Sequence, residues 1–233
     1  MLTKGNNHEP KTIDDIIFGN NESKLRIEDI VSGAEAIPYC GKSAILLYGC
    51  FGTGKTTLAK MLPNHIEYGK TKEEIIWDPV FIGCQQGFNG PQLMTRIDTI
   101  LATISLNVSG LHYIILDEVD NLTKQAQQSL KSAMNTTRGI FILTTNNVSQ
   151  LDKGLLDRCV LVEMNAADPK AYLDIAKSIA NETGVTLSNE ELLPTIQAAN
   201  GSFRNLSHNV GRLARRQTLR LSLIHISEPT RPY

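Results

Sequence analysis

Short, continuous apolar runs alternate with amphipathic stretches along most of this chain. A continuous apolar run is typical of a parallel strand that is buried on both faces, whereas apolar residues spaced three and four positions apart are typical of a helix. We expect strands at 44–48, 80–82, 112–116, 139–143 and 160–162. We expect helices before and between them at 12–17, 22–32, 92–103, 124–134 and 151–158. This order predicts an α/β fold, a parallel sheet covered by helices on both faces.

The pattern changes after residue 166, where the sequence indicates helices without strands. Asp168-Pro169 has the cap residue and the proline that are typical of a helix start, and Gly184 is typical of its end. Ser188-Asn189-Glu190-Glu191 is a capping box for a second helix, and Ser202 can begin a third. The chain therefore ends in a small all-helical unit.

Two domains and a foreign tail are expected from these patterns. We expect an α/β nucleotide-binding domain over 1–166 and a helical domain over 167–220. Residues 221–233 resemble a sequencing-library adapter translated in frame, so we exclude them from the prediction of fold and function, as for a cloning scar. A genuine C-terminal strand is the alternative for this tail.

The composition is ordinary for a globular protein, with 233 residues, 41% hydrophobic residues and a net charge of −1. The balance of charge does not indicate a nucleic-acid-binding protein, although a local basic face remains open. No stretch approaches the roughly 18 apolar residues that cross a membrane, and the N-terminus shows no apolar signal region. The four cysteines form no C-x-x-C pair, so we expect reduced thiols and no zinc site. We expect a cytoplasmic protein (in the host cytoplasm if a phage encodes it) without membrane contact.

The segment 49–56 has the sequence Gly-Cys-Phe-Gly-Thr-Gly-Lys-Thr, which fits the phosphate-binding pattern G-x-x-x-x-G-K-[ST]. It lies between the predicted strand 44–48 and an apolar helix at 57–62, which we expect Pro63 to stop. Strand, glycine loop and helix is the context that the pattern requires. A glycine-rich turn without a ligand is the alternative, and both the lysine and the threonine at the end of the pattern argue against it.

The chemistry of this loop suits a nucleoside triphosphate with magnesium. Glycines let the backbone fold around a polyphosphate and direct amide hydrogens at it, and the helix N-terminus adds partial positive charge. Lys55 can reach the β and γ phosphates, and the Thr56 hydroxyl can ligate magnesium. The ATP-binding residues that we expect are Gly49, Gly52, Thr53, Gly54, Lys55, Thr56 and Thr57.

A second group of chemically active residues follows the apolar run 112–116, in the acidic box Asp117-Glu118-Val119-Asp120. Catalytic groups of open α/β sheets lie at the carboxyl ends of such strands. We expect Asp117 to hold magnesium and Glu118 to polarise an attacking water. A solvated acidic turn is the alternative, but beside a phosphate loop two carboxylates favour hydrolysis over transfer to a small substrate.

These motifs, in this order, resemble those of AAA+ ATPases, and among them the clamp-loader subunits of the replication factor C and phage type. Further matching segments are the helix 126–134, the strand ending in Asn146, the motif Asp157-Arg158-Cys159 and the motif Gly201-Ser202-Phe203-Arg204. The resemblance covers about residues 10–213 and implies an AAA+ P-loop NTPase domain followed by a helical lid. The collar domain of clamp loaders is absent from this sequence.

The resemblance assigns roles to three further residues. Asn146 corresponds to the sensor asparagine that orients the water or touches the γ-phosphate. Arg158 corresponds to an arginine finger that reaches the ATP of a neighbouring subunit, and Arg204 to the second sensor, which ties the lid to the γ-phosphate. Their alternatives are a loop asparagine, a solvated surface arginine and a helix-face arginine.

Other residues are assigned more loosely or depart from the family. Ile16 and Ile17 match the segment near adenine, although core packing explains them equally well. Lys131 matches a basic DNA-contacting position and Arg96 lies near another, although both suit a solvated face. The chain has Asn135 where relatives usually have Glu, and Asp157 where they usually have Ser. A basic run at Arg212, Arg215, Arg216 and Arg220 receives no role.

The resemblance implies an ATP-hydrolysing subunit of a DNA sliding-clamp loader. ATP binding would order a ring of subunits that opens the clamp and grips primer-template DNA, and hydrolysis would release both. The expected partners are other clamp-loader subunits, a sliding clamp and DNA, with ATP and magnesium as ligands.

Two alternatives remain open. The chain could belong to another AAA+ machine, such as a branch-migration helicase or a protein remodeller, which a winged-helix domain after the lid would indicate. It could also be an ATP-binding scaffold subunit without hydrolysis. The intact residues Lys55, Asp117, Glu118 and Arg204 argue against the scaffold.

Overall fold

The computed structural model describes residues 10–84 and 90–226, with residues 220–226 described by their backbone alone. Five strands form one sheet in the order β2-β3-β4-β1-β5, and every neighbouring pair is parallel. The strands are β1 (Ala44–Tyr48), β2 (Val80–Gly83), β3 (His112–Asp117), β4 (Gly139–Thr145) and β5 (Cys159–Glu163). The predicted strands are all present, each within two residues of its expected bounds, and the α/β fold is confirmed.

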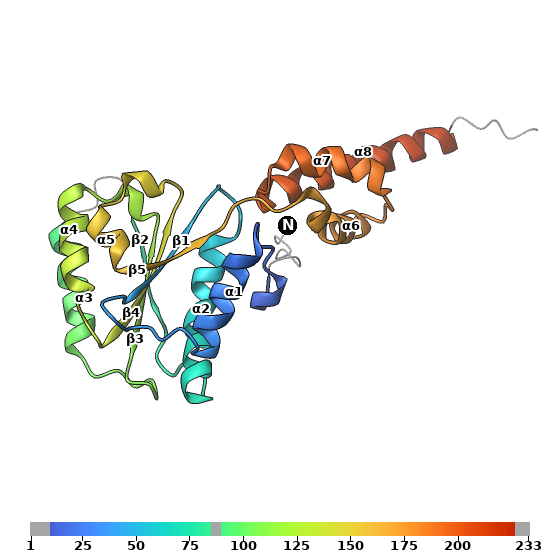
Figure 1. Cartoon of the computed structure of the whole chain (residues 1–233). Helices are drawn as coiled ribbons and strands as arrows, with labels where there is room; N and C mark the ends of the chain where they lie inside the picture. The colour runs from blue at the N-terminus through green and yellow to red at the C-terminus, as the bar shows by residue number, and fades with distance from the viewer. Residues whose placement is uncertain (1–9, 85–89, 227–233) are drawn as a thin grey trace, which may run out of the picture. The chain divides into compact units, whose positions relative to one another are not determined.

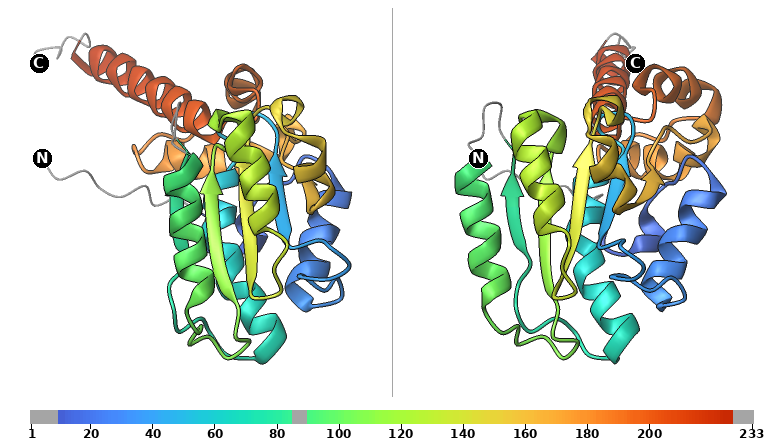
Figure 2. Two further views of the ribbon diagram at one scale, coloured as in Figure 1. Left: turned by 90° about the vertical axis from the view of Figure 1, so that its left-hand side faces the viewer. Right: turned by 60° about the vertical axis from the view of Figure 1, so that its left-hand side comes forward.

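Helices cover both faces of this sheet (Figures 1 and 2). One face carries α1 (Asn21–Ser32) and α2 (Lys55–Thr71), preceded by the single turn η1 (Ile13–Asp15). The other face carries α3 (Gly90–Ala102), α4 (Lys124–Ala133) and α5 (Lys153–Asp157), with the short turns η2 (Val119–Asn121) and η3 (Val148–Gln150) between them. The sequence also indicates a loop at 85–90 between β2 and α3; its residues lie outside the described part of the chain except for Gly90, which begins α3.

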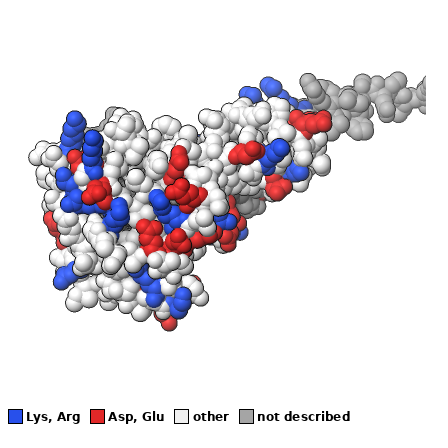
Figure 3. Space-filling model, viewed as in Figure 1, with Lys and Arg blue, Asp and Glu red and all other residues white. Residues whose placement is uncertain are grey.

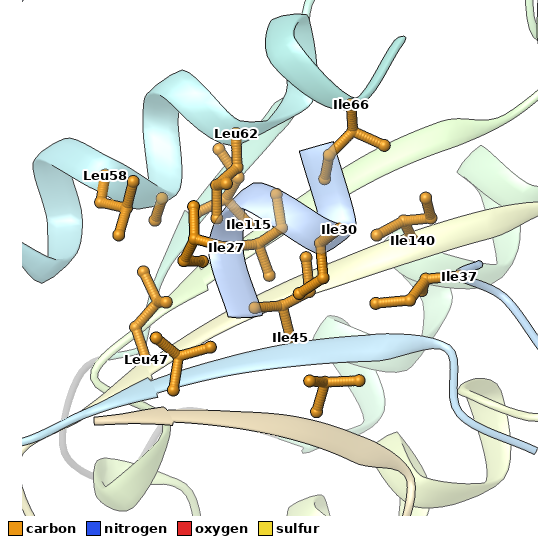
Figure 4. Close-up of a cluster of buried hydrophobic side chains, with 14 of the residues drawn as sticks. Ile27, Ile30, Ile37, Ile45, Leu47, Leu58, Leu62, Ile66, Ile115 and Ile140 are labelled. Carbon is orange, nitrogen blue, oxygen red and sulfur yellow. The ribbon is translucent and has the colours of Figure 1, made fainter. Parts of the chain in front are cut away.

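Strand β1 shows how the sheet feeds two hydrophobic cores. Ile45 and Leu47 point towards α1 and α2, in the cluster drawn in Figure 4, while Ala44 and Leu46 point towards α3, α4 and α5. All four side chains are fully buried. Burying a Leu or Ile side chain contributes about 1.5–3 kcal/mol, so the side chains on both faces stabilise β1 in the interior of the sheet, between β4 and β5.

The helix after the phosphate loop continues through Pro63, so our prediction that Pro63 stops it is wrong. A proline inside a helix loses one hydrogen bond and costs about 3 kcal/mol. Leu58, Leu62 and Ile66 lie on both sides of it and are buried in the core. At about 1.5–3 kcal/mol for each of these side chains, burial outweighs the cost of the proline.

Most helix ends follow caps that are visible in the sequence. Thr123 accepts a hydrogen bond from the amide of Ala126 at 3.2 Å, and Gly33 ends α1 with φ 84°. Not every apolar residue of α1 is buried, since Leu25 is 49% exposed. Ile27 and Ile30 define the buried face of α1, and a residue two positions before Ile27 lies on the far side of the helix.

The chain divides into two compact units between Asn165 and Ala166. The second unit contains η4 (Pro169–Tyr172), α6 (Leu173–Asn181), α7 (Asn189–Ala199) and α8 (Phe203–Ile226). Its core is formed by buried side chains of these helices, including Tyr172, Ala176, Ile179, Leu192, Ile196, Leu206 and Val210. The predicted capping box of α7 is present, since the Ser188 and Glu191 side chains bind each other's backbone amides.

Helix α8 extends beyond residue 220, into the segment that we had excluded. The backbone of residues 221–226 is helical, so the strand that we gave as an alternative for the tail is not present there. Residues 227–233 lie outside the described part of the chain. Among the helices that the structure describes, none combines the length and the apolar character needed to cross a membrane.

Candidate active site

The phosphate-binding loop joins the end of β1 to the first residue of α2. Gly49, Gly52 and Gly54 have φ values of 145°, 77° and 92°, which side chains with a Cβ rarely adopt. A Cβ on Gly49 would also stand 2.5 Å from the backbone oxygen of Met164, in the segment after β5. The glycines of the pattern are therefore required by backbone geometry and by the close approach of a second segment.

Lys55 is 7% exposed and folds back over this loop. Its Nζ donates hydrogen bonds to the carbonyl oxygens of Gly49, at 3.0 Å, and Cys50. Burial lowers the pKa of Lys55, and the nearby Cys50 and Asp117 oppose that shift. A desolvated ammonium group beside a glycine-rich loop is suited to bind phosphate oxygens.

The loop is also held by Asn165, which the sequence analysis did not identify. Asn165 Oδ1 accepts a hydrogen bond from the amide of Cys50 at 3.2 Å, and its Nδ2 donates to Glu163 Oε1 at 2.5 Å. The contact joins residues 115 positions apart in the chain. No sequence motif marks this asparagine, because its role depends on β5 lying beside β1.

Asp117 lies at the end of β3, where residues of α2 and β4 bind its carboxylate. Thr56 Oγ1 donates to Asp117 Oδ1 at 2.8 Å, and Thr144 Oγ1 donates to the same oxygen at 2.6 Å. Thr56 is the second residue of α2, and Thr144 lies in β4, next to β3. Magnesium in phosphate sites takes one or two carboxylates, oxygen ligands and phosphates, so Thr56 and Asp117 fit the ion that the sequence predicts.

Glu118 has a strained backbone, with φ 59° and ψ 52°. A non-glycine residue in this left-handed region costs about 1–3 kcal/mol and persists when its surroundings hold it. Here the amide of Glu118 donates to Thr144 Oγ1 at 3.0 Å, and Asn121 Nδ2 donates to Glu118 Oε2 at 3.2 Å. The backbone of Glu118 is thereby held by Thr144 and its carboxylate by Asn121.

Thr144 is a second residue that the sequence analysis missed. Its side chain is buried and bridges Asp117 and the amide of Glu118. We predicted the strand to end at Leu143, but β4 runs to Thr145, and its register with β3 brings Thr144 beside Asp117. The signal available in the sequence was the pair of threonines directly before Asn146.

The remaining predicted residues of the sheet unit are placed as follows. Asn146 follows β4 directly and is half-buried, and its side chain makes no hydrogen bond to another described residue. Ile16 is buried, with its Cδ1 3.9 Å from the position of a Cβ on Gly54, so it belongs to the core and also adjoins the loop. Ile17 and Thr57 are half-buried.

Arg158 lies at the amino edge of the sheet. Its backbone oxygen accepts hydrogen bonds from the amides of Ser43 and Ala44, at the start of β1. Its guanidinium donates from Nε to Asn135 Oδ1 at 2.9 Å and from Nη1 to the oxygen of Gly154 at 2.8 Å. The structure therefore does not bring Arg158 together with Lys55 and Asp117 in one chain.

The other predicted basic residues are more dispersed. Arg204 is exposed on α8, in the helical unit. Lys131 of α4 is paired with Asp152, the cap residue of α5, with Nζ–Oδ1 3.4 Å, and Arg96 is exposed on α3. Figure 3 shows Lys and Arg side chains on the part of the sheet unit formed by α4 and α5. Lys131 thus has a structural partner, and the solvated alternative remains for Arg96.

Comparison with known proteins identifies the fold and its relatives. Residues 45–165 match the family of ATPases associated with various cellular activities (AAA). Over 201 residues the chain is 28% identical to replication factor C small subunit 2 of Pyrobaculum islandicum, covering 84% of this chain and 59% of the relative. Over 206 residues it is 25% identical to the replication factor C large subunit of Methanosarcina mazei, covering 85% of this chain and 31% of the relative.

A solved structure of a variant of Thermotoga maritima RuvB superposes with a TM-score of 0.64 at 19% identity, covering 94% of this chain and 68% of that one. At this identity the likeness concerns the fold alone. The chain spans less than two thirds of the length of the replication factor C relatives described above.

Proposed function

Because the chain belongs to the AAA family of ATPases, we propose that it is an ATP-hydrolysing subunit of a DNA sliding-clamp loader. Its similarity to replication factor C small and large subunits supports this choice among AAA machines. The likeness to RuvB rests on the fold, so it does not favour a branch-migration helicase. As a subunit it would act with further clamp-loader subunits, a sliding clamp and primer-template DNA.

The observation that carries the proposal is the convergence of Thr56 and Thr144 on one oxygen of Asp117. It joins the phosphate loop to the acidic box at the carboxyl edge of the sheet, where open α/β sheets place their ligands. A scaffold subunit that only binds ATP has no need of a fixed carboxylate at Glu118, beside this point.

The residues of the chain divide the work of hydrolysis. The loop amides and Lys55 would bind the β and γ phosphates, and Thr56 and Asp117 would hold magnesium, which neutralises charge on the phosphates. Glu118 would accept a proton from the attacking water, and Asn146 would orient that water. Thr144 binds the carboxylate of Asp117 and the backbone amide of Glu118, so it holds the metal ligand and the backbone that carries the general base.

Two arginines would link hydrolysis to assembly and to the lid. Arg158 would contact the γ-phosphate of a neighbouring subunit, because its place at the amino edge separates it from the loop of its own chain. Arg204 would contact the γ-phosphate from the helical unit. ATP binding would then order the ring, open the clamp and grip primed DNA, and hydrolysis would release them in the cytoplasm.

The proposal is tested by ATP hydrolysis in the presence and absence of a sliding clamp and primed DNA. The protein is the chain joined to a collar domain of a clamp loader, compared with its Glu118→Gln and Lys55→Ala variants. We expect clamp and primed DNA to stimulate hydrolysis. Glu118→Gln should bind ATP and hydrolyse it far more slowly, whereas Lys55→Ala should weaken ATP binding itself. Hydrolysis at the wild-type rate in both variants would contradict the site. Hydrolysis that ignores clamp and DNA would contradict the clamp-loader assignment and leave the ATPase intact.

A further inference from the structure

A groove of about 250 Å³ lies between α7 and α8 of the helical unit. Its polar lining consists of Arg212, Arg216 and Asn209 from α8 and Thr195 from α7. Its apolar floor includes Pro194 and Leu213. The groove lies within one unit, and none of the residues assigned to ATP hydrolysis lines it.

The positive charge of this groove is not neutralised by the protein. Between Phe203 and Leu219, α8 carries four arginines and no Asp or Glu. Arg212 and Arg216 are exposed, and neither forms an ion pair or hydrogen bond with another residue in the described part of the chain. In Figure 3, basic side chains gather on α8 beside the grey end of the chain.

The acid of α7 that reaches α8 is already engaged. Glu191 accepts hydrogen bonds from Ser188 and from Gln217 Nε2, the latter at 2.5 Å. These hydrogen bonds lower the pKa of Glu191, so it is a charged cap of α7 with partners of its own. The two arginines of the groove therefore remain available to an external anion.

Helix geometry separates the two groove arginines from their neighbour. Arg212 and Arg216 are four positions apart, so they lie about 6 Å apart along α8 on the same side. Arg215 is also exposed, but it projects about 100° away from Arg216 and does not line the groove. A ligand of the groove would contact the first two and not the third.

We propose that this groove binds the sugar-phosphate backbone of a nucleic acid strand, with Arg212 and Arg216 each contacting a phosphate. Arginine, asparagine and threonine are side chains that supply phosphate contacts in nucleic-acid complexes. The planar guanidinium fork matches phosphate oxygens with two parallel hydrogen bonds. The inference goes beyond the proposed function, sharing with it only DNA as a partner, and it does not depend on ATP hydrolysis.

A nucleic acid fits this surface better than an acidic protein does. Protein interfaces depend on a few buried aromatic or large apolar anchors. In the described part of the helical unit, Leu219 is the one large hydrophobic side chain that is strongly exposed, and it does not line the groove. The groove therefore offers charge and hydrogen-bond donors without an anchor pocket.

The test measures binding of the full chain, without nucleotide, to fluorescein-labelled single-stranded and duplex DNA by fluorescence anisotropy over a series of salt concentrations. The compared variants are Arg216→Ala, its matched control Arg215→Ala, and the double variants Arg212→Ala/Arg216→Ala and Arg212→Lys/Arg216→Lys. Each single variant removes one exposed arginine from the same helix. Unlabelled poly-glutamate serves as a competitor that represents an acidic protein, and thermal unfolding checks that every variant is folded.

We expect Arg216→Ala to weaken DNA binding several-fold more than Arg215→Ala. The double alanine variant should reduce the slope of log K against log salt by about 1.8 for duplex or about 1.4 for single strands, since two phosphate contacts are lost. The double lysine variant should retain that slope, because it keeps both charges, while losing part of the affinity.

Equal losses in Arg215→Ala and Arg216→Ala, or an unchanged salt slope in the double alanine variant, would show that the groove is not the DNA site. Competition by poly-glutamate as effective as that by DNA would assign the groove to an acidic protein and overturn the proposal. Either result leaves the ATPase test with Glu118→Gln unaffected. Conversely, a chain that binds DNA through this groove but shows no clamp-stimulated hydrolysis would contradict the proposed function alone.

Discussion

Lys55 and Arg158 lie at opposite ends of the strands of one parallel sheet, Lys55 at the carboxyl ends and Arg158 at the amino ends. Lys55 follows the carboxyl end of β1, whereas the backbone oxygen of Arg158 binds the amides of Ser43 and Ala44 at the amino end of that strand. A five-residue strand is about 16 Å long, more than an arginine side chain can span. An arginine at the amino edge is therefore available to a neighbouring molecule and not to the phosphate loop of its own chain.

The first prediction concerns hydrolysis shared between subunits. Arg158→Ala should leave the ATP affinity of a single subunit unchanged and should lower hydrolysis in the assembled ring by about 10³-fold, as for arginine fingers supplied in trans. Mixing Arg158→Ala subunits with Glu118→Gln subunits should restore part of the activity, because some interfaces regain both groups. ATP binding and steady-state hydrolysis of each protein and of the mixture are the measurements. No recovery on mixing, together with weaker ATP binding by the single subunit, would place Arg158 in its own site.

The second prediction treats Asn135 as a positioning residue for this arginine. Asn135 Oδ1 accepts the hydrogen bond of Arg158 Nε, so Asn135→Ala should leave the guanidinium held by Gly154 alone. A hydrogen bond to a charged group is worth about 1.5–3 kcal/mol, so ring-dependent hydrolysis should fall by about tenfold or more. Asn135→Asp keeps an acceptor and should retain the activity. The same loss in both variants, or weaker ATP binding by the single subunit, would show a general structural effect instead.

The third prediction separates the two threonines at the end of β4. Thr144→Val removes the hydroxyl that binds Asp117 and the amide of Glu118, so it should lower both stability and the rate of hydrolysis. Thr145→Val is a matched control, because its hydroxyl donates to Asp120 at 2.9 Å and accepts from the amide of Asn147 at 3.0 Å. The free energy of unfolding, measured in urea, should fall by about 1–3 kcal/mol in both variants, since each leaves buried polar groups without a hydrogen-bond partner. A larger loss of kcat in Thr144→Val at saturating magnesium is expected, and equal kcat losses would contradict the role of Thr144.

The fourth prediction uses the cysteines as probes of the loop. Burial raises the pKa of Cys84 and of Cys159 to about 12, so neither forms appreciable thiolate at pH 8. Cys40 and Cys50 are exposed and should react with iodoacetamide in the native state. ATP with magnesium should slow modification of Cys50, which lies in the phosphate loop, and should not affect Cys40. Mass spectrometry of the modified peptides measures both rates, and protection of the two cysteines to the same extent would contradict nucleotide binding at the loop.

Local patterns accounted for most of the fold. The strands were predictable because a strand buried on both faces requires a continuous apolar run, and β1 satisfies this requirement residue by residue. The capping box at Ser188 and the glycine that ends α1 were predictable because each satisfies backbone groups within its own turn. Pro63 was not, because its cost is local while the burial that outweighs it comes from α1 and the sheet.

The sequence by itself determined the phosphate loop and the acidic box, since each is a short segment whose chemistry depends on residues close together in the chain. Only the tertiary structure decided which side chains support them. Asn165 meets Cys50, and Thr144 meets Asp117, because parallel strands in the order β3-β4-β1-β5 bring distant residues to one edge of the sheet. The same order places Arg158 at the other edge, where it is held by Asn135. Spacing along the chain carries no information about such pairs, because strand order is set by packing over the whole sheet.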